Sequence, residues 1–369
     1  MIEKGRIGNW QLFLIVLFII LPTAILSVPG VTTVLAKQDG WIAVLLATAA
    51  GTTMAVVIGM YYKYFPQQSL VGVGEIALGR WLGKLVGIGY IWFILHANSI
   101  IIREFGEFLT TAVMPRTPLS VFNISVVILA AWAVYQGLEP IGRMAEFIFP
   151  LVMPATLVVV VLVFRDAEPM RLLPVAHQNV KGILAGSMVP ASWMGEVVLV
   201  ALITPYVYQQ RRSILWVVAG VIVVGLFLAV ITMNATMVFG FQNTRHLLFP
   251  TYSLARIISI GNIIERVESL VMAIWVAGVF LKIAIWFYML VLVTGETFAL
   301  RSYKPLIIPY GFVQIALSFW LFNNFMEFIS FIGTTWPVYS IGIFELGIPV
   351  IVLLIALVRR KVRGDNAQA

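Results

Sequence analysis

The 369-residue chain has no cysteine and only three histidines. Without cysteine it forms no disulfide and offers no thiolate ligand to a metal, and no spacing joins the histidines into a metal site. The sequence also lacks a nucleophile elbow, a pair of catalytic carboxylates and a nucleotide-binding loop. We therefore expect a protein that is not an enzyme and that uses no cofactor and no metal.

Charge is also scarce. Charged residues make up 11% of the chain and hydrophobic residues 61%, with a mean hydropathy of +1.00. Soluble domains carry about 25% charged residues, so the composition excludes a soluble protein. The net charge of +8 is explained by basic residues beside anionic lipid, and we expect no binding to nucleic acid. The chain is predicted to form a single transmembrane domain over residues 1–369 of a multi-pass protein of the cell membrane.

Apolar stretches of about 20 residues, the length needed to cross a bilayer, occur repeatedly. The ten predicted crossings are 9–36, 40–62, 84–113, 119–136, 144–164, 181–203, 213–240, 267–295, 305–323 and 334–358. The first is long and interrupted by proline, so we expect it to be retained rather than removed as a secretory signal. Of the 24 Lys and Arg residues, fourteen fall on the side of the termini and eight on the other. This asymmetry places both termini in the cytoplasm.

The first and sixth stretches are interrupted at their centres. The first reads Pro-Thr-Ala-Ile-Leu-Ser-Val-Pro-Gly over 22–30, and the sixth contains Gly186, Pro190 and Gly195. Two interrupted helices that lie five segments apart predict a five-plus-five inverted repeat, with repeats at about 9–164 and 181–358. We expect an all-α fold of ten transmembrane helices, with helices one and six broken.

In such a repeat the two breaks meet near the bilayer midplane and hold the ligand. Free N–H groups at the start of a half-helix suit a carboxylate, and released carbonyls suit an ammonium group or a cation. The alternative is a proline kink that neighbouring side chains repair. The predicted ligand-binding residues are Thr23, Ala24, Ile25, Leu26, Ser27, Gly30, Ser187, Pro190, Ala191, Ser192, Trp193 and Glu196.

Two ionisable residues fall deep within apolar stretches, where an uncompensated charge is costly. Glu196 follows the second break, and we expect it to bind a ligand amine, an ion or a proton, or to form an internal ion pair. Lys282 lies near the middle of its stretch, too deep to reach the membrane surface easily. It either pairs with a carboxylate such as Glu196 or Glu345, or places its ammonium group in the site of a coupling cation.

The third stretch carries His96, Arg103 and Glu107, whose spacings of seven and four residues place them on one side of a helix. Arg103 and Glu107 form an i, i+4 pair, which is either structural or part of a proton route lined by His96. The candidates for an ion or proton pathway are His96, Glu107, Glu196, Lys282 and Tyr288.

Three regions resemble the spore germination B-subunit permeases. They are the Ile-Gly-Asn-Trp-Gln-Leu run at 7–12 with Thr-Ala-Ile-Leu at 23–26, the segment 65–84, and the segment 265–282. One departure is Pro22, where such permeases commonly have glycine. The resemblance covers essentially the whole chain. It implies membership of the amino acid, polyamine and organocation transporter superfamily, with its leucine-transporter-like fold.

The resemblance also implies a function. The chain would be the integral-membrane subunit of a germinant receptor in the spore inner membrane, binding a small nutrient such as an amino acid. Its partners would be a membrane A subunit and a lipoprotein C subunit. Two alternatives need the same midplane pocket: a proton- or cation-coupled amino acid permease, and a ligand-gated conduit for ions or water.

Overall fold

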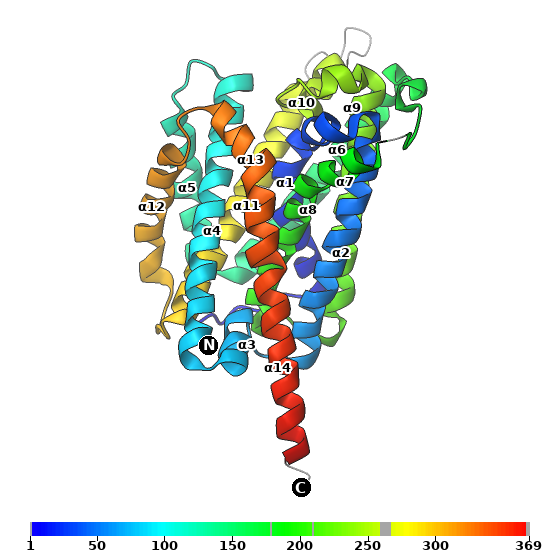
Figure 1. Cartoon of the computed structure of the whole chain (residues 1–369). Helices are drawn as coiled ribbons and strands as arrows, with labels where there is room; N and C mark the ends of the chain where they lie inside the picture. Colours follow the sequence, from blue (N-terminus) through cyan, green and yellow to red (C-terminus); the bar gives the residue numbers. More distant parts are fainter. Residues whose placement is uncertain (1, 178, 209, 259–266, 367–369) are drawn as a thin grey trace.

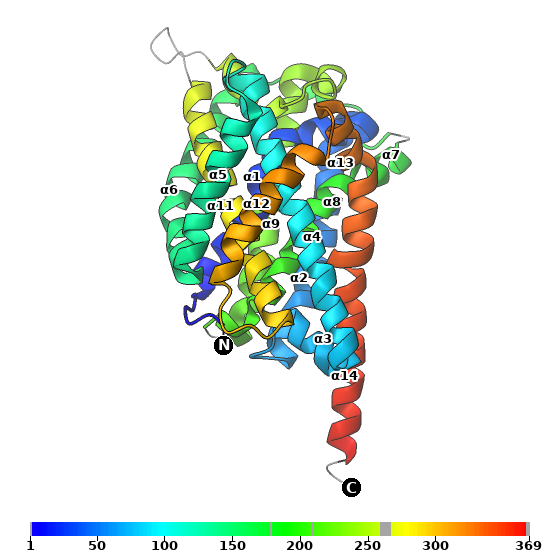
Figure 2. The same cartoon turned by 90° about the vertical axis from the view of Figure 1, so that its left-hand side faces the viewer.

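A computed structural model describes residues 2–177, 179–208, 210–258 and 267–366, and it is built from helices (Figures 1 and 2). Within these residues there is no β-strand, and a single isolated backbone pairing joins Ile7 to Val207. Both termini lie at the same end of the molecule (Figure 1). An all-α membrane fold is therefore confirmed. Residues 265 and 266, which begin the third region of resemblance, lie outside the described residues.

The predicted crossings correspond to helices in the same order. The first five are α1 (Asn9–Ala36), α2 (Gly40–Tyr64), α4 (Arg80–Phe108), α5 (Leu119–Gln136) and α6 (Leu138–Val163). The second five are α7 (Val180–Gly186) with α8 (Met188–Gly195), α9 (Gln210–Thr244), α11 (Val267–Thr297), α12 (Ile307–Trp320), and α13 (Phe325–Tyr339) with α14 (Gly347–Asn366). Two shorter helices, α3 (Leu70–Leu78) and α10 (Pro250–Ile257), lie between crossings.

Eight helical stretches in the described ranges are long and apolar enough to cross a membrane. The first of them contains both α1 and α2, which are two crossings. The helix α12 has only 14 residues and so falls below the length of the other eight. These two facts account for the difference between eight stretches and ten predicted crossings. The boundaries of the two repeats stay a prediction.

The expected break in the first crossing is wrong, because α1 is one continuous helix with Pro22 and Pro29 inside it. Proline has no N–H to donate, so Pro29 leaves the carbonyl of Ile25 without its helical partner. Thr251 of α10 donates its hydroxyl to that carbonyl. Trp275 of α11 donates its indole N–H to the carbonyl of Pro22 at 2.6 Å. Thr251 therefore repairs the helix at Pro29, which is the alternative that the sequence left open, and Trp275 adds a second bond to the same part of α1.

The sixth crossing is divided, as predicted. The helix α7 ends at Gly186 and α8 begins at Met188, with Ser187 between them in helical torsion angles, so the two are nearly continuous. The larger change comes where α8 ends at Gly195. A 3₁₀-helix, η5 (Glu196–Leu202), follows. Runs of 3₁₀-helix longer than three or four residues are uncommon, and within a helix they often mark a functional hinge. Glu196 is the first residue of η5 and therefore lies at the point where the helix changes its geometry.

The helix α1 lies where two groups of helices meet. It is buried over most of its length and contacts α2, α6, α8, α9 and α11. On one side α2 packs against α8 and α9, and on the other α4 packs against α5, α11 and α12. Figure 1 shows α4, α5 and α12 at the left and α2, α7 and α8 at the right. Side chains of α1 therefore meet residues from both groups.

Candidate functional site

A buried ion pair joins three of the crossings. The Nζ atom of Lys282 on α11 lies 2.7 Å from Oε2 of Glu196 on η5, and it donates a second hydrogen bond of 2.7 Å to Oγ1 of Thr23 on α1. The side chains of Lys282 and Glu196 are 0% and 4% exposed. Since an unpaired charge at this depth is costly, the pair holds α1, η5 and α11 together. Pairing with Glu196, one of the predicted interpretations of Lys282, is what the structure shows.

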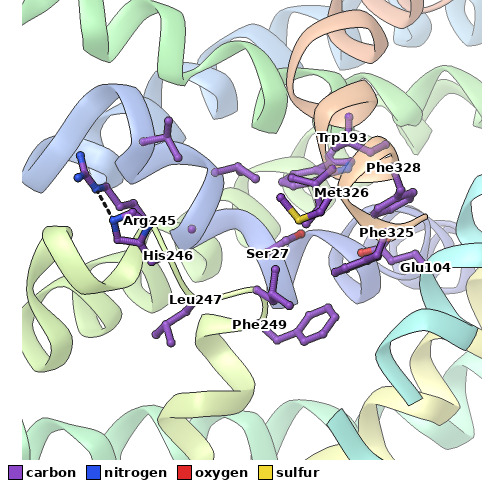
Figure 3. Close-up of a pocket in the computed structure, with 16 residues that line it drawn as sticks. Ser27, Glu104, Trp193, Arg245, His246, Leu247, Phe249, Phe325, Met326 and Phe328 are labelled. Atoms are coloured by element: carbon purple, nitrogen blue, oxygen red, sulfur yellow. Dashed lines mark hydrogen bonds between the residues drawn. The ribbon is translucent and has the colours of Figure 1, made fainter. Parts of the chain in front are cut away.

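A cavity of about 250 Å³ lies between α1, α4, α8, α13 and the segment that joins α9 to α10 (Figure 3). Its apolar lining includes Trp193 of α8, Phe249 of the connecting segment and Phe328 of α13. Ligand pockets are typically apolar clefts with a few polar groups that fix the orientation of the ligand. The volume suits a small molecule. In Figure 1, α10 and α13 place this region toward the end opposite the termini.

The polar residues that line the cavity are Ser27, Glu104, Arg245 and His246. They differ in charge and in how deeply they are buried. Glu104 on α4 is only 8% exposed, whereas Arg245 and His246 are exposed. The Nε atom of Arg245 donates a hydrogen bond of 3.1 Å to Nε2 of His246. Figure 3 shows this pair on one side of the cavity, Glu104 on the other and Ser27 between them. A small molecule with one cationic and one anionic end therefore matches the charges of the lining.

Three of the predicted ligand-binding residues, Ser27, Gly30 and Trp193, line this cavity. Two others, Thr23 and Glu196, belong to the ion pair with Lys282. The sequence therefore identified five residues of α1, α8 and η5 that lie either at the cavity or at the ion pair with Lys282. Their binding of a ligand stays a prediction.

The remaining predicted ligand-binding residues do not line the cavity. Ala24 and Ser192 are fully buried, and the hydroxyl of Ser192 donates to the carbonyl of Val189. Pro190 and Ala191 are buried beside Ser192. Others that do not line it are Ile25 and Leu26, which face a separate apolar cavity of about 40 Å³, and Ser187, whose hydroxyl donates to the carbonyl of Leu184.

The candidates for an ion or proton pathway do not form one cluster. His96 stacks on Trp92, with ring centroids 5.4 Å apart. Glu107 pairs with Arg103 at 2.7 Å. Tyr288 donates a hydrogen bond of 3.1 Å to the carboxylate of Glu3, near the N-terminus. Only Glu196 and Lys282 of the five candidates contact each other.

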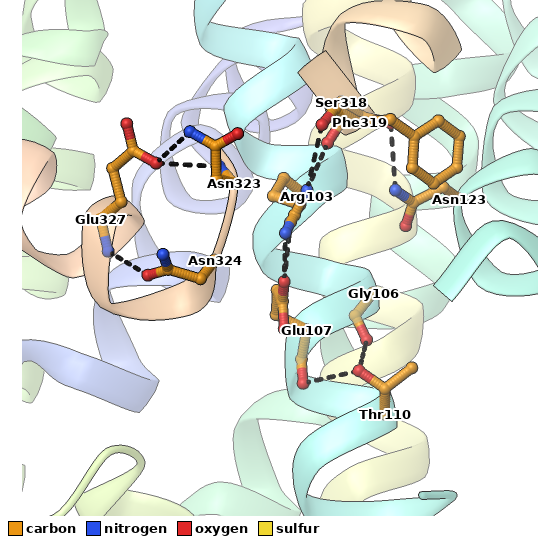
Figure 4. A network of polar contacts seen from close by, with 10 residues as sticks. All are labelled: Arg103, Gly106, Glu107, Thr110, Asn123, Ser318, Phe319, Asn323, Asn324 and Glu327. Atoms are coloured by element: carbon orange, nitrogen blue, oxygen red, sulfur yellow. Dashed lines mark hydrogen bonds and ion pairs between the residues drawn. The ribbon is translucent and has the colours of Figure 1, made fainter. Parts of the chain in front are cut away.

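The pair of Arg103 and Glu107 holds the end of another helix (Figure 4). Arg103 is 6% exposed, and its Nη1 donates to the carbonyls of Ser318 and Phe319 at 3.2 and 3.4 Å. These carbonyls lie in the last turn of α12, where helical partners are missing. Asn123 of α5 adds a hydrogen bond of 3.0 Å to the hydroxyl of Ser318. The contacts support the structural interpretation of this pair.

We expect Arg103→Ala to lower the thermal stability of the protein in detergent, because it leaves Glu107 and two helix-end carbonyls without their donor. The loss should be about 1–3 kcal/mol, the cost of unsatisfied buried groups. Arg143→Ala is the matched control, since Arg143 and Glu139 form the same i, i+4 pair with side chains 71% and 43% exposed. Exposed pairs contribute little. Equal shifts in the unfolding midpoints of the two variants would contradict this account.

Sequence reasoning missed the polar lining of the cavity. Glu104 follows Arg103 directly, but neighbouring residues point about 100° apart around a helix, so the stripe of His96, Arg103 and Glu107 excludes it. Arg245 and His246 lie in a connecting segment that no periodic pattern reaches. The one signal for Glu104 is a carboxyl within an apolar stretch, and the sequence carries that signal.

Comparisons with known proteins agree with this fold and composition. A family model described as spore germination protein matches residues 6–326. Spore germination protein KB of Bacillus subtilis (strain 168) is 26% identical, over 99% of this chain and 98% of that protein. Spore germination protein YndE of the same organism is 23% identical, over 97% and 98%. The match therefore extends over nearly the full length of both relatives.

Solved structures show the same fold at low sequence identity. MhsT in complex with L-phenylalanine is similar with a TM-score of 0.67 at 14% identity, over 96% of each chain. A Na⁺-coupled sialic acid symporter is similar with a TM-score of 0.63 at 11% identity, over 96% of this chain and 89% of that one. Both have the leucine-transporter-like fold. The chain belongs to the spore germination protein family, and it is a multi-pass membrane protein with a leucine-transporter-like fold.

Proposed function

We propose that the chain is the integral-membrane subunit of a nutrient germinant receptor, and that it binds an amino acid in the cavity between α1, α4, α8 and α13. The observation that carries the proposal is the lining of this cavity. A buried carboxylate, Glu104, and an exposed guanidinium, Arg245, lie on opposite sides of an apolar space (Figure 3). An amino acid carries one cationic and one anionic group, which match the two signs of charge in the lining.

The lining suggests how the ligand lies. Its ammonium group would pair with Glu104, because a charge-assisted hydrogen bond is strongest where water is excluded. Its carboxylate would face Arg245 at the mouth. The side chain would contact the apolar walls formed by Trp193, Phe249 and Phe328. Such walls discriminate between side chains by size rather than by hydrogen bonding.

The proposed location is the inner membrane of a bacterial spore, with both termini in the cytoplasm and with A and C receptor subunits as partners. Two features support it. The relatives are spore germination proteins, and α14 extends beyond the other helices at the end of the termini (Figure 1). There it carries the exposed Arg359, Arg360 and Lys361, which suit anionic lipid and the cytoplasmic side.

Transport of the ligand is the second candidate function, because solved structures with this fold include a Na⁺-coupled symporter. A permease coupled to a proton or cation, or a conduit for ions or water that the ligand opens, would use the same cavity. The candidates differ in whether both ends of the cavity open during one cycle. Reconstituted vesicles separate them: uptake of labelled amino acid at ordinary carrier rates favours a permease, and binding without uptake favours a receptor.

We expect spores that carry Glu104→Gln to lose their response to the amino acid that triggers germination through this protein. The change removes the charge that Glu104 carries when it pairs with the ligand ammonium group, and it keeps the shape. Charged hydrogen bonds contribute about 1.5–3 kcal/mol, or about 10- to 100-fold in affinity. The measurement is the loss of optical density after each nutrient is added to a deletion strain complemented with wild type or variant.

The control is Glu139→Gln, a change of the same type at an exposed side chain, with protein abundance measured in the spore membrane. It should respond as the wild type does. A deletion strain that germinates normally with every nutrient would overturn the receptor function. A normal response of Glu104→Gln at wild-type abundance would leave the receptor but reject this cavity as its ligand site.

A further inference from the structure

The carboxyl group of Glu345 is buried in the interior of the protein and forms no ion pair within the described residues. Glu345 is 1% exposed, and neither of its oxygens forms a hydrogen bond of ordinary geometry in the part of the chain that the structure describes. It is the last residue of a π-helical turn, η8 (Ser340–Glu345), between α13 and α14. The buried hydroxyl of Ser340, at the start of this turn, lies near the Glu345 carboxyl group and interacts with it, but the two do not reach the geometry of an ordinary hydrogen bond. Turns of π-helix within α-helices are frequent at functional sites.

Glu345 lies directly against the junction of α8 and η5. Its carboxylate oxygen Oε2 occupies the space that a side chain at Gly195 would need. Glycine therefore allows the backbone of α8 to approach the carboxyl group closely. The next residue is Glu196, the partner of Lys282. Glu345 and the ion pair thus meet at the point where the sixth crossing changes from α-helix to 3₁₀-helix.

The groups that face Glu345 provide no free positive charge. The ammonium of Lys282, on α11, is already bonded to Glu196 and Thr23. The nearby phenols of α2 and α4 donate elsewhere, Tyr61 to the carbonyl of Pro349 and Tyr90 to that of Phe344.

Among the described residues, the remaining elements packed against η8 add no ammonium or guanidinium group near Glu345. The helix α8 and residues 347–358 of α14 contain no titratable side chain. The helix α13 contributes Tyr339, whose ring packs against Phe344 and whose hydroxyl interacts with Trp92 of α4. On α4, Glu104 adds a further carboxyl that interacts electrostatically with Lys282 and Glu196. The imidazole of His96, also on α4, packs against the ring of Tyr339. Lys282 is thus the one ammonium or guanidinium among these described groups, and it faces three carboxyl groups.

We propose that Glu345 is a proton-binding site. An ionised carboxylate without hydrogen bonds is far more costly in an apolar interior than the neutral acid, so this conformation holds Glu345 protonated. The proton comes from bulk water, binds one carboxylate oxygen, and returns to water when the α8–η5 junction moves away from η8 and the carboxyl group becomes hydrated. Protonation thereby favours the arrangement in which the junction packs against η8.

A metal cation fits this position poorly. Hard cations take six or more oxygen ligands, and the described residues contain no group of three His, Cys, Asp or Glu side chains that suits a metal. Glu345 does not line the ligand cavity, so the failure of either proposal leaves the other standing.

Infrared spectroscopy of the purified full-length protein tests the proposal, because a protonated carboxyl group has a C=O band that is distinct from the carboxylate bands and moves in D₂O. At about pH 7, where an exposed glutamate is ionised, we expect Glu345→Gln to lose one carboxyl group's share of this band. The control Glu139→Gln changes an exposed side chain and should leave the band intact. A band of equal intensity in wild type and Glu345→Gln overturns the proposal.

Thermal unfolding provides the second readout. If the folded protein binds a proton that the unfolded chain releases, the free energy of unfolding falls as the pH rises. We therefore expect the unfolding midpoint to fall less with rising pH in Glu345→Gln than in the wild type, and the apolar Glu345→Met to behave in the same way. Both neutral variants should fold. If both fail to fold, the site requires an ionised carboxylate and the proposal is rejected.

Discussion

Lys282→Met is expected to remove most of the folded protein from the membrane. The variant removes the only cation that pairs with Glu196 among the described residues, since the ammonium of Lys282 contacts it at 2.7 Å and both side chains are almost inaccessible. The buried carboxyl group must then either remain charged without a partner or take up a proton, and both cost stability relative to the intact pair. Removing one partner of a buried pair costs about 3–5 kcal/mol, which is a large part of the 5–15 kcal/mol that stabilises a typical protein. Abundance in membranes and the unfolding midpoint in detergent measure the effect.

The double variant Lys282→Met with Glu196→Gln is the control for this result. It removes both charges and leaves no uncompensated ion, so we expect it to recover much of the lost stability. A double variant as unstable as Lys282→Met would show that the ammonium supports the fold by other contacts, such as the one to Thr23. Rescue of Lys282→Met by added Na⁺ or K⁺ would instead identify Lys282 as a substitute for a bound cation.

Most of the fold was predictable because membrane crossings are encoded locally. About 20 apolar residues are needed to span a bilayer, and α2, α4 and α5 each begin and end within a few residues of the predicted stretches. The pairing of Lys282 with Glu196 was predicted as one of two interpretations for a similar reason. A charge at that depth needs a partner, and few ionisable residues lie in apolar stretches.

The continuity of the first crossing was not predictable from its own residues. Pro22 and Pro29 make a break reasonable, but whether the helix continues depends on partners for the carbonyls that the prolines free. Thr251 and Trp275, more than two hundred positions along the chain, supply hydrogen bonds to this part of α1. The division at Gly195 was predicted from the local glycines and proline of the sixth crossing.

The residues that line the cavity were also only partly predictable from the sequence. Ser27 and Trp193 were found because they lie at the predicted breaks, whereas Glu104 and Arg245 come from segments that only the tertiary structure brings to the cavity. Conversely, Ala24 and Ser192 were predicted as ligand contacts and are fully buried away from it. On a helix, one residue of shift turns a side chain by about 100°. Proximity to a break therefore identifies a region, but not the side chains that face a ligand.

Ser27→Phe is expected to abolish the response to the ligand while leaving the protein folded. Ser27 is half-buried on α1 and lies in the centre of the cavity, between Glu104 and Arg245 (Figure 3). A phenyl ring there occupies the space proposed for the ligand without displacing packed side chains. Binding of labelled amino acid to purified protein and germination of spores should both be lost, with abundance and unfolding midpoint close to those of the wild type.

Two further variants separate loss of the site from loss of the fold. Ser27→Ala keeps the cavity open and should retain most of the response. Ser192→Phe introduces the same ring at a fully buried position whose hydroxyl bonds to Val189. Overpacking of a core costs about 1–3 kcal/mol, so this variant should lose stability as well as response. Normal binding in Ser27→Phe would place the ligand elsewhere, because a filled cavity has no room for both.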